Sequence, residues 1–283
     1  MEEALVRAAL IHAPDADCFC LACHHLVIDG VSWRIITADL ETAFAQDKGG
    51  KAIQLPRKTQ PYADYARAIR KYRNSYRLTQ EIPYWNAVQK KLESLPLSDG
   101  KDYSREFARL TVTMSAEDTE RFLRTNYDAF GLTLNDALLT AVCRSWRRLR
   151  GDRPVPVQLE GHGREELDEP LYTDRTVGWF TSIYPVVFEG LTGDMRRDLM
   201  AVKETLHRIP HKGVGYNVLR YAGGEDAPDF HTDRIPPLSF NYLGEMDEGS
   251  PEEETQFRAA HIDTGEAVGS RNTEGSGFSI NCL

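Results

Sequence analysis

Two short stretches of the sequence contain the residue types that transfer protons. The first, CHHLVIDGVSW, occupies residues 23–33, and the second, EGHGRE, occupies residues 160–165. An imidazole titrates near neutral pH, and a carboxyl group does so when burial raises its pKa, so both serve as general acids and bases. The chain therefore carries a candidate base, a histidine of the first stretch, and a candidate acid, Glu160.

A β-hairpin and a helix are expected to position the histidines. Residues 5–12 and 18–27 have the composition of two strands joined by a turn at residues 13–17. Successive side chains of a strand face opposite ways, so His24 and His25 cannot both point into one cavity. Asp29 and Gly30 end the strand, and Ser32 can cap a helix whose apolar residues recur at helical spacing.

The rest of the chain alternates between helical and strand-like patterns. Helices are expected at residues 61–93 with an interruption near Pro83, from Ser115 to about 127, from Thr133 to Gly151 and at residues 195–208. Strands are expected at residues 107–114, 155–160, 181–188 and 238–243, and a late strand begins near residue 277. The turn-forming cluster at residues 95–100 predicts a boundary between two domains, residues 1–100 and 101–283.

Glu160 and Asp29 both lie just past the end of a strand. Glu160 precedes Gly161 and Gly163, which permit a tight loop close to a substrate, so its carboxyl group is well placed for proton transfer. Asp29 is expected to hold its turn or to form a buried ion pair with an arginine. The sequence alone leaves the partner open among Arg164, Arg34 and Arg175.

Composition excludes several classes of function. The chain has 283 residues, 41% of them hydrophobic and 27% charged, and a net charge of −9, which opposes binding to nucleic acid or to an anionic membrane. It has no apolar run long enough to span a bilayer, and Met1-Glu2-Glu3 does not resemble the start of a signal peptide. A soluble, cytoplasmic protein is therefore expected.

Five cysteines without a secretory signal are expected to be reduced thiols. Cys18, Cys20 and Cys23 lie near the two histidines and raise the alternative of a zinc site. Strand alternation would place Cys23 on the face opposite the other two, which argues against that alternative, and no metal is expected. The run Gly213-Val214-Gly215 lacks the strand and the lysine of a phosphate loop, so no nucleotide is expected either.

Several segments together resemble one known family. They are residues 24–33 with an HHxxxDG signature, residues 135–141, residues 160–165, residues 175–181 (RTVGWFT), residues 213–216 (GVGY) and residues 240–244 (FNYLG). This ordered set resembles the epimerization branch of the condensation superfamily of nonribosomal peptide synthetases. The resemblance implies an α/β (α+β) fold of two lobes with chloramphenicol acetyltransferase-like architecture. It also implies that the N-terminal lobe is incomplete and that the C-terminus is clipped.

The resemblance assigns roles to particular residues. His25 faces the tunnel between the lobes, with His24 packed behind it, and Glu160 faces His25 from the other lobe. The enolate oxygen is expected to be bound by Tyr216, by Asn241 or by backbone amides after Gly30, with Tyr216 ranked first. Trp179, Phe180 and Thr181 are expected to line the substrate tunnel. Supporting roles fall to the remaining motif residues: Asp29, Gly30, Trp33 and Arg164.

The expected activity is epimerization of the α carbon of an aminoacyl or peptidyl thioester in the synthesis of secondary metabolites. Two protonatable groups on opposite faces of that carbon, His25 and Glu160, would exchange its proton. No diffusible cofactor is expected, because the substrate rides on the phosphopantetheine of a partner peptidyl carrier protein or synthetase module. The alternatives are amide- or ester-forming acyl transfer, and a catalytically silent carrier-docking remnant. Missing strands would also predict self-association or complementation by a separate chain.

Overall fold

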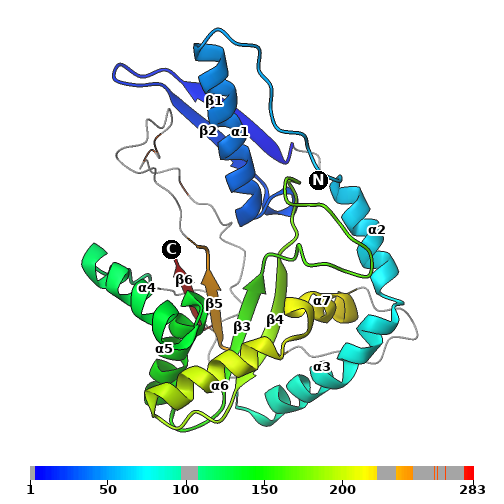
Figure 1. The fold of residues 1–283 in the computed structure, drawn as a ribbon, viewed down its shortest axis with the longest axis vertical. Coiled ribbons are helices and arrows are strands. Elements are labelled where there is room, and N and C mark those ends of the chain that lie inside the picture. The colour runs from blue at the N-terminus through cyan, green and yellow to red at the C-terminus, as the bar shows by residue number, and fades with distance from the viewer. Residues whose placement is uncertain are drawn as a thin grey trace.

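The structure is a computed structural model. It describes residues 4–96, 108–221, 234–244, 258, 260, 265 and 277–283. These residues form two separate sheets, one of two strands and one of four, and helices connect the strands (Figure 1). Among the described residues, no helix combines the length and the hydrophobicity that crossing a bilayer would require.

The first sheet is an antiparallel hairpin. It consists of β1 (Val6–Ile11) and β2 (Cys18–Cys23), with Val6 opposite Cys23 and Ile11 opposite Cys18. A single 3-10 turn, η1 (His25–Val27), follows, and then the long helix α1 (Gly30–Lys48). Every residue of β1 is exposed, and Figure 1 shows the hairpin and α1 together at one end of the molecule, apart from the second sheet.

The second sheet has four strands in the order β4-β3-β5-β6. Its strands are β3 (Val155–Gly161), β4 (Ser182–Phe188), β5 (Leu238–Tyr242) and β6 (Phe278–Cys282). β3 runs antiparallel to β4 and parallel to β5, and β5 runs parallel to β6. β4 is almost entirely buried, as expected for a strand covered by helices.

The hydrophobic core surrounds this second sheet. The helices other than α1 are α2 (Tyr62–Tyr72), α3 (Tyr76–Ser94), α4 (Ala116–Phe130), α5 (Leu134–Arg150), α6 (Met195–His207) and α7 (Val214–Tyr221), the last preceded by the turn η2 (Pro210–Gly213). α3, α6 and α7 pack against β4, and α5 packs against β3 and α6. Trp85 and Leu92 of α3 are fully buried in this core.

The domain boundary proposed at residue 100 stays a prediction, because residues 97–107 lie outside the described part of the chain. The packing of α3 shows that this boundary does not separate two independent cores. α3 precedes that boundary, yet its buried face belongs to the core of the second sheet. The first 100 residues therefore contribute both the first sheet and part of the core around the second.

Three predicted elements differ from the structure. β2 ends at Cys23, so the expected strand over residues 18–27 is too long, because the chain turns into η1. Residues 108–114 form no strand, and their alternating apolar residues Leu110 and Val112 are 87% and 83% exposed. Pro83 does not interrupt α3, since the buried residues Glu81 and Trp85 on either side hold the helix in the core.

Candidate functional site

His24 and His25 lie in a turn rather than in a strand. The prediction that their side chains face opposite ways because they alternate along a strand therefore does not apply. The Nδ1 atom of His24 accepts a hydrogen bond of 3.1 Å from the backbone N–H of Leu26 and so caps η1. His24 is exposed, and the prediction that it packs behind its neighbour is wrong. The imidazole of His25 instead makes an edge contact with the indole of Trp179, with 5.6 Å between the ring centroids.

Asp29 forms a buried ion pair with Arg164, which resolves the choice among three arginines. Nη1 of Arg164 lies 2.7 Å from Oδ2 of Asp29, and Nη2 lies 3.1 Å from Oδ1, so the guanidinium binds both carboxylate oxygens. The two side chains are only 7% and 2% exposed. The other candidates have different partners, since Arg34 donates to the carbonyl of Leu243 and Arg175 pairs with Asp39.

Asp29 also caps α1. Its Oδ1 accepts hydrogen bonds from the backbone N–H of Ser32 at 2.8 Å and from the Ser32 hydroxyl at 2.7 Å. The predicted cap at Ser32 is therefore wrong, because the helix begins at Gly30. Burial raises the pKa of Asp29, but hydrogen bonds from Arg164, Ser32 and the amide of Phe180 outweigh that effect and hold its pKa below the usual range.

Glu160 stands near the end of β3, on the strand that pairs with both β4 and β5. The Nδ2 group of Asn241, on β5, donates a hydrogen bond of 2.8 Å to its Oε2 atom. Glu160 is an exposed residue, but the atoms around its carboxyl group partly remove it from water and so raise its pKa, while the charge of His25 works in the opposite direction. Glu160 and His25 therefore lie within electrostatic reach of each other, although one follows the first sheet and the other belongs to the second.

A glycine gives the loop after Glu160 its shape. Gly163 has a φ of +68°, and a Cβ atom added there would lie 1.6 Å from the carbonyl oxygen of Phe180. Only glycine fits both the left-handed backbone and this close approach. The next residue, Arg164, is thereby held over the ring of Phe180, with 4.0 Å from the guanidinium carbon to the ring centroid.

The connection between β3 and β4 carries the three residues predicted to line a tunnel. Phe180 is 2% exposed and packs against Tyr65 with 4.6 Å between ring centroids, so its side chain belongs to the packed interior. Trp179 is 36% exposed beside His25, and Thr181 is half-buried. Of the three side chains, the structure thus places Trp179 against the candidate base.

Tyr216 does not join this group. It lies on α7, is 2% exposed and packs against Trp85 with 5.1 Å between ring centroids. The glycines of its motif have packing roles, because a Cβ atom at Gly213 would lie 1.9 Å from the ring of Tyr184, and one at Gly215 would lie 2.0 Å from the carboxylate of Glu81. The expected role of Tyr216 as a donor to an enolate stays a prediction.

Gly30 and Trp33 complete the first motif. Gly30 is exposed, and a Cβ atom added there would meet no other atom within 4 Å, so local packing does not require a glycine. Trp33 is half-buried in the first turn of α1 and donates its backbone N–H to the carbonyl of Asp29. Cys18 and Cys20 share one face of β2, with 3.8 Å between their sulfurs. The described residues contain no cluster of three or more potential metal ligands.

The comparison with protein families decides the identity of this fold. The family model of the condensation domain matches residues 1–281. The chain belongs to the condensation-domain family. Its predicted fold class, a mixed α/β structure of the chloramphenicol acetyltransferase type, is confirmed by solved structures of that family.

Relatives of this condensation-family domain are nonribosomal peptide synthetases. It is 35% identical over 283 residues to bacitracin synthase 3 of Bacillus licheniformis, covering 99% of this chain and 4% of that protein. It is 38% identical over 255 residues to surfactin synthase subunit 1 of Bacillus subtilis, covering 88% of this chain and 7% of that protein. The chain thus spans a small part of the length of these relatives.

Two solved structures resemble this chain to different degrees. The epimerization domain from the third module of tyrocidine synthetase B is 33% identical, with a TM-score of 0.87, and the match covers 98% of this chain and 63% of that one. The first condensation domain of the calcium-dependent antibiotic synthetase is 18% identical, with a TM-score of 0.66 over 86% of this chain and 52% of that one. The second likeness concerns the fold alone.

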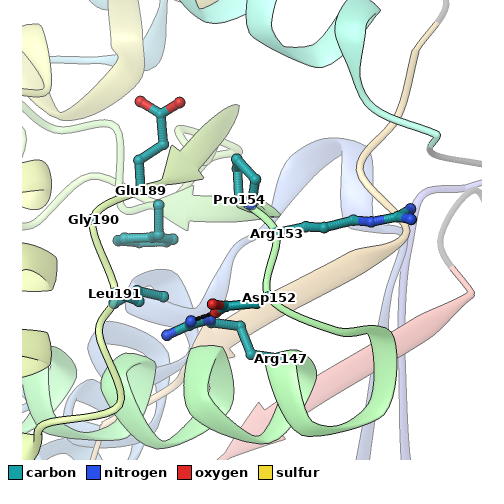
Figure 2. A pocket seen from close by; sticks show the side chains of 8 residues that line it. Arg147, Asp152, Arg153, Pro154, Glu189, Gly190 and Leu191 are labelled. Atoms are coloured by element: carbon teal, nitrogen blue, oxygen red, sulfur yellow. Dashed lines mark ion pairs between the residues drawn. The ribbon is translucent and has the colours of Figure 1, made fainter.

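A separate pocket of about 190 Å³ lies at the opposite end of β3 and β4 (Figure 2). Its lining includes Arg147 and Asp152, which form an ion pair, and Glu189, which pairs with Lys91 at 2.6 Å. Because Pro154 at its wall directly precedes β3 whereas Glu160 lies near the far end of that strand, this pocket is remote from His25. We do not include it in the candidate site.

Two residues make contacts in the site that the sequence did not indicate. The hydroxyl of Ser32 lies 3.0 and 3.1 Å from the carbonyl oxygen and the amide nitrogen of Gly178, and Tyr62 donates its hydroxyl to the carbonyl of Trp179 at 2.7 Å. The sequence indicated Ser32 only as a helix cap, which predicts its place at the start of α1 but not its contact with Gly178. A tyrosine at the start of α2 gives no such signal, because its partner is a backbone atom.

Proposed function

We propose that this condensation-family domain epimerizes the α carbon of an aminoacyl or peptidyl thioester carried on the phosphopantetheine of a peptidyl carrier protein. The observation that carries the proposal is the contact of His25, in the turn η1, with Trp179, which is separated from β4 by two residues, because Glu160 pairs with Ile183 at the start of that strand. The 33% identity to a solved epimerization domain supports it further. The proposal requires no diffusible cofactor, because the reaction only exchanges a proton.

The chemistry follows from the two groups. One of them removes the α-proton, and the electron pair of the broken C–H bond moves to the thioester oxygen to form an enolate. The other group then returns a proton to the opposite face of the carbon. The raised pKa of Glu160 favours the role of acid, because it increases the fraction of the protonated carboxyl group.

Asn241 and the start of α1 fit supporting roles. The amide of Asn241 binds Oε2 of Glu160 and can fix the orientation of that carboxyl group. The first backbone N–H groups of an α-helix lack partners within the helix and carry partial positive charge. Among the amides that follow Gly30, those of Ser32 and Trp33 donate to Asp29, so the N–H of Val31 is the candidate donor to the enolate oxygen.

Deuterium exchange tests this proposal. The chain is incubated in heavy water with an L-aminoacyl carrier thioester, and α-deuteration is followed by mass spectrometry. We expect exchange by the wild type and a loss of about 10²- to 10⁴-fold in His25→Ala and Glu160→Gln, the range that one general acid or base contributes. Glu204→Gln, on the exposed face of α6, is the matched control and should exchange at the wild-type rate.

A second candidate function is amide formation between two carrier-bound substrates, which the match to the condensation-domain model favours. The same chain offered a donor and an acceptor carrier would then yield a new amide and no α-deuteration. Binding of a loaded carrier without either reaction would instead identify a silent docking domain. Either result would contradict epimerization.

A further inference from the structure

A short segment at the start of α2 binds the connection between β3 and β4. We call residues 59–62, which end at the first residue of α2, the strap. The backbone N–H of Gln60 donates to the carbonyl of Tyr172 at 2.9 Å, and Oε1 of Gln60 accepts from the N–H of Tyr172 at 2.7 Å. The hydroxyl of Thr59 accepts from the N–H of Arg175 at 3.1 Å. Figure 1 shows this connection running between the start of α1 and α2.

The main chain on both sides of Trp179 is held by three different residues. The hydroxyl of Ser32 contacts both backbone polar groups of Gly178. Tyr62 of the strap donates to the carbonyl of Trp179 itself. On the other side, the N–H of Phe180 donates to Oδ2 of Asp29 at 3.1 Å.

The Tyr62 ring adds packing to its hydrogen bond. It makes an edge contact with Phe180 at 5.0 Å between centroids, and a Cβ atom at Gly178 would lie 2.4 Å from its Cδ2 atom. Because three consecutive backbone units are fixed in this way, the Cα atom from which the indole of Trp179 projects is held in place. The edge contact of the indole with His25, at 5.6 Å and an interplanar angle of 67°, is therefore supported by residues outside the sequence motifs and by Ser32 within one.

The imidazole of His25 needs such a contact. His25 is exposed and begins a turn of only three residues, so its own element does little to restrict the side chain. We propose that Tyr62 and Ser32 are positioning residues, which act through Trp179 to hold the imidazole of His25 in its contact with the indole. This inference rests on the proposed function for its kinetic consequence, but the position of the imidazole can be measured independently.

Tyr62→Phe tests the strap while preserving the ring. The matched control is Tyr76→Phe, at a tyrosine of α3 that is 79% exposed. The first readout is the NMR signal of the His25 imidazole, which the ring current of Trp179 displaces. We expect Tyr62→Phe to move this signal toward its position in Trp179→Leu, whereas Trp179→Phe, which restores an aromatic edge, should retain part of the displacement. Tyr76→Phe should leave it unchanged.

The second readout is the rate of α-deuteration. In Tyr62→Phe we expect kcat to fall by about fivefold, the factor that corresponds to one neutral hydrogen bond, with KM for the loaded carrier unchanged. Ser32→Ala should lower kcat further, because the hydroxyl touches Asp29 as well as Gly178. Because a loss of folded protein would also lower the apparent kcat with KM unchanged, kcat is calculated per amount of folded protein, which the amplitude of circular dichroism gives for each variant.

Gly178→Ala approaches the same contact from the other side. The added methyl group would collide with the Tyr62 ring, so this variant should also move the His25 signal. In a Tyr62→Ala background, where the ring is gone, Gly178→Ala should have a smaller additional effect on that signal.

The two readouts separate the possible failures. If the wild type incorporates no deuterium, the proposed function is wrong, and the NMR signal still decides whether the strap positions His25. If Tyr62→Phe and Tyr76→Phe have the same His25 signal and the same kcat, the inference is overturned. An additive effect of Gly178→Ala and Tyr62→Ala on the signal would also contradict it.

Discussion

At the scale of single residues, Asp29 contributes to the fold rather than to proton transfer. Its carboxylate accepts hydrogen bonds from the helix α1, from Arg164 and from Phe180, so one side chain joins three segments. The sequence indicated a structural role for this aspartate. It could not select the partner, because an ion pair across 135 positions of the chain leaves no local pattern.

The first prediction concerns Asp29→Asn. Removing one partner of a buried ion pair is expected to lower the free energy of unfolding by about 3–5 kcal/mol at pH 7. The folded-state pKa of Asp29 is lowered, so the stability contributed by its ionised form is complete above the ordinary aspartate pKa of about 3.9. That stability is lost as the pH falls through the lowered value. Urea denaturation at a series of pH values below 5 should therefore show the difference between variant and wild type shrinking.

Asp64→Asn is the control for this experiment. Asp64 pairs with Arg67 on the surface of α2, where an ion pair contributes about 0–1 kcal/mol. Equal destabilisation by the two substitutions would contradict the special role of Asp29. So would a difference from wild type that stayed constant with pH.

Residue types gave the candidates for the site, and the resemblance chose among them. His24, His25 and Glu160 stood out as groups that can transfer protons, and the resemblance selected His25 from the pair and opposed Glu160 to it. Tyr216 was selected in the same way, yet it lies in the core against Trp85, because a motif in one sequence does not distinguish packing from chemistry. Tyr62 was missed, since a hydroxyl that binds a backbone carbonyl has no characteristic partner residue.

At the scale of elements, patterns contained within a few residues predicted the structure well. Thr133 and Asp136 form a reciprocal capping box at the start of α5, and Gly151 ends that helix, as their spacing indicated. Predictions that required a partner far away in the sequence were less successful. Residues 108–114 alternate like a strand, but alternation describes a suitable surface and does not supply a neighbouring strand.

The second prediction of stability concerns the loop after β3. Gly163→Ala should lower the free energy of unfolding by about 2–4 kcal/mol, because the methyl group meets the carbonyl of Phe180 and the backbone is left-handed. Gly190→Ala is a matched control, since Gly190 has a similar φ of +72° but open space around it. It should cost about 1 kcal/mol, the backbone contribution alone. Equal effects in thermal and urea denaturation would show that the close contact with Phe180 is unimportant.

At the scale of the whole molecule, burial is distributed unevenly between the two sheets. β3 and β4 supply fully buried residues such as Val157 and Val186, whereas the apolar side chains of β1, including Leu10 at 57% and Ile11 at 51%, are exposed. A hairpin with one open face gains little from burial. The expectation that such surface promotes self-association stays a prediction.

Hydrogen exchange should reveal this unevenness. We expect amides of β1 and β2 to exchange through local opening at a free energy well below that of global unfolding, and amides of β3 and β4 to exchange near the global value. Exchange measured by mass spectrometry on proteolytic peptides would distinguish the two sheets. Equal protection would mean that the hairpin is covered in solution, and a change in protection with protein concentration would identify a second copy as the cover.

The ion pair between Asp29 and Arg164 also has a consequence for how the chain is made. Because the arginine follows the aspartate by 135 positions, a ribosome adding 5–20 residues per second delivers it about 7–27 s after Asp29. During that interval the cap of α1 can form through Ser32, but the carboxylate has no guanidinium to accompany it into the interior. The nascent segment around Asp29 must therefore keep its carboxylate in contact with water, and the two sheets can close on each other only after Arg164 has been synthesised.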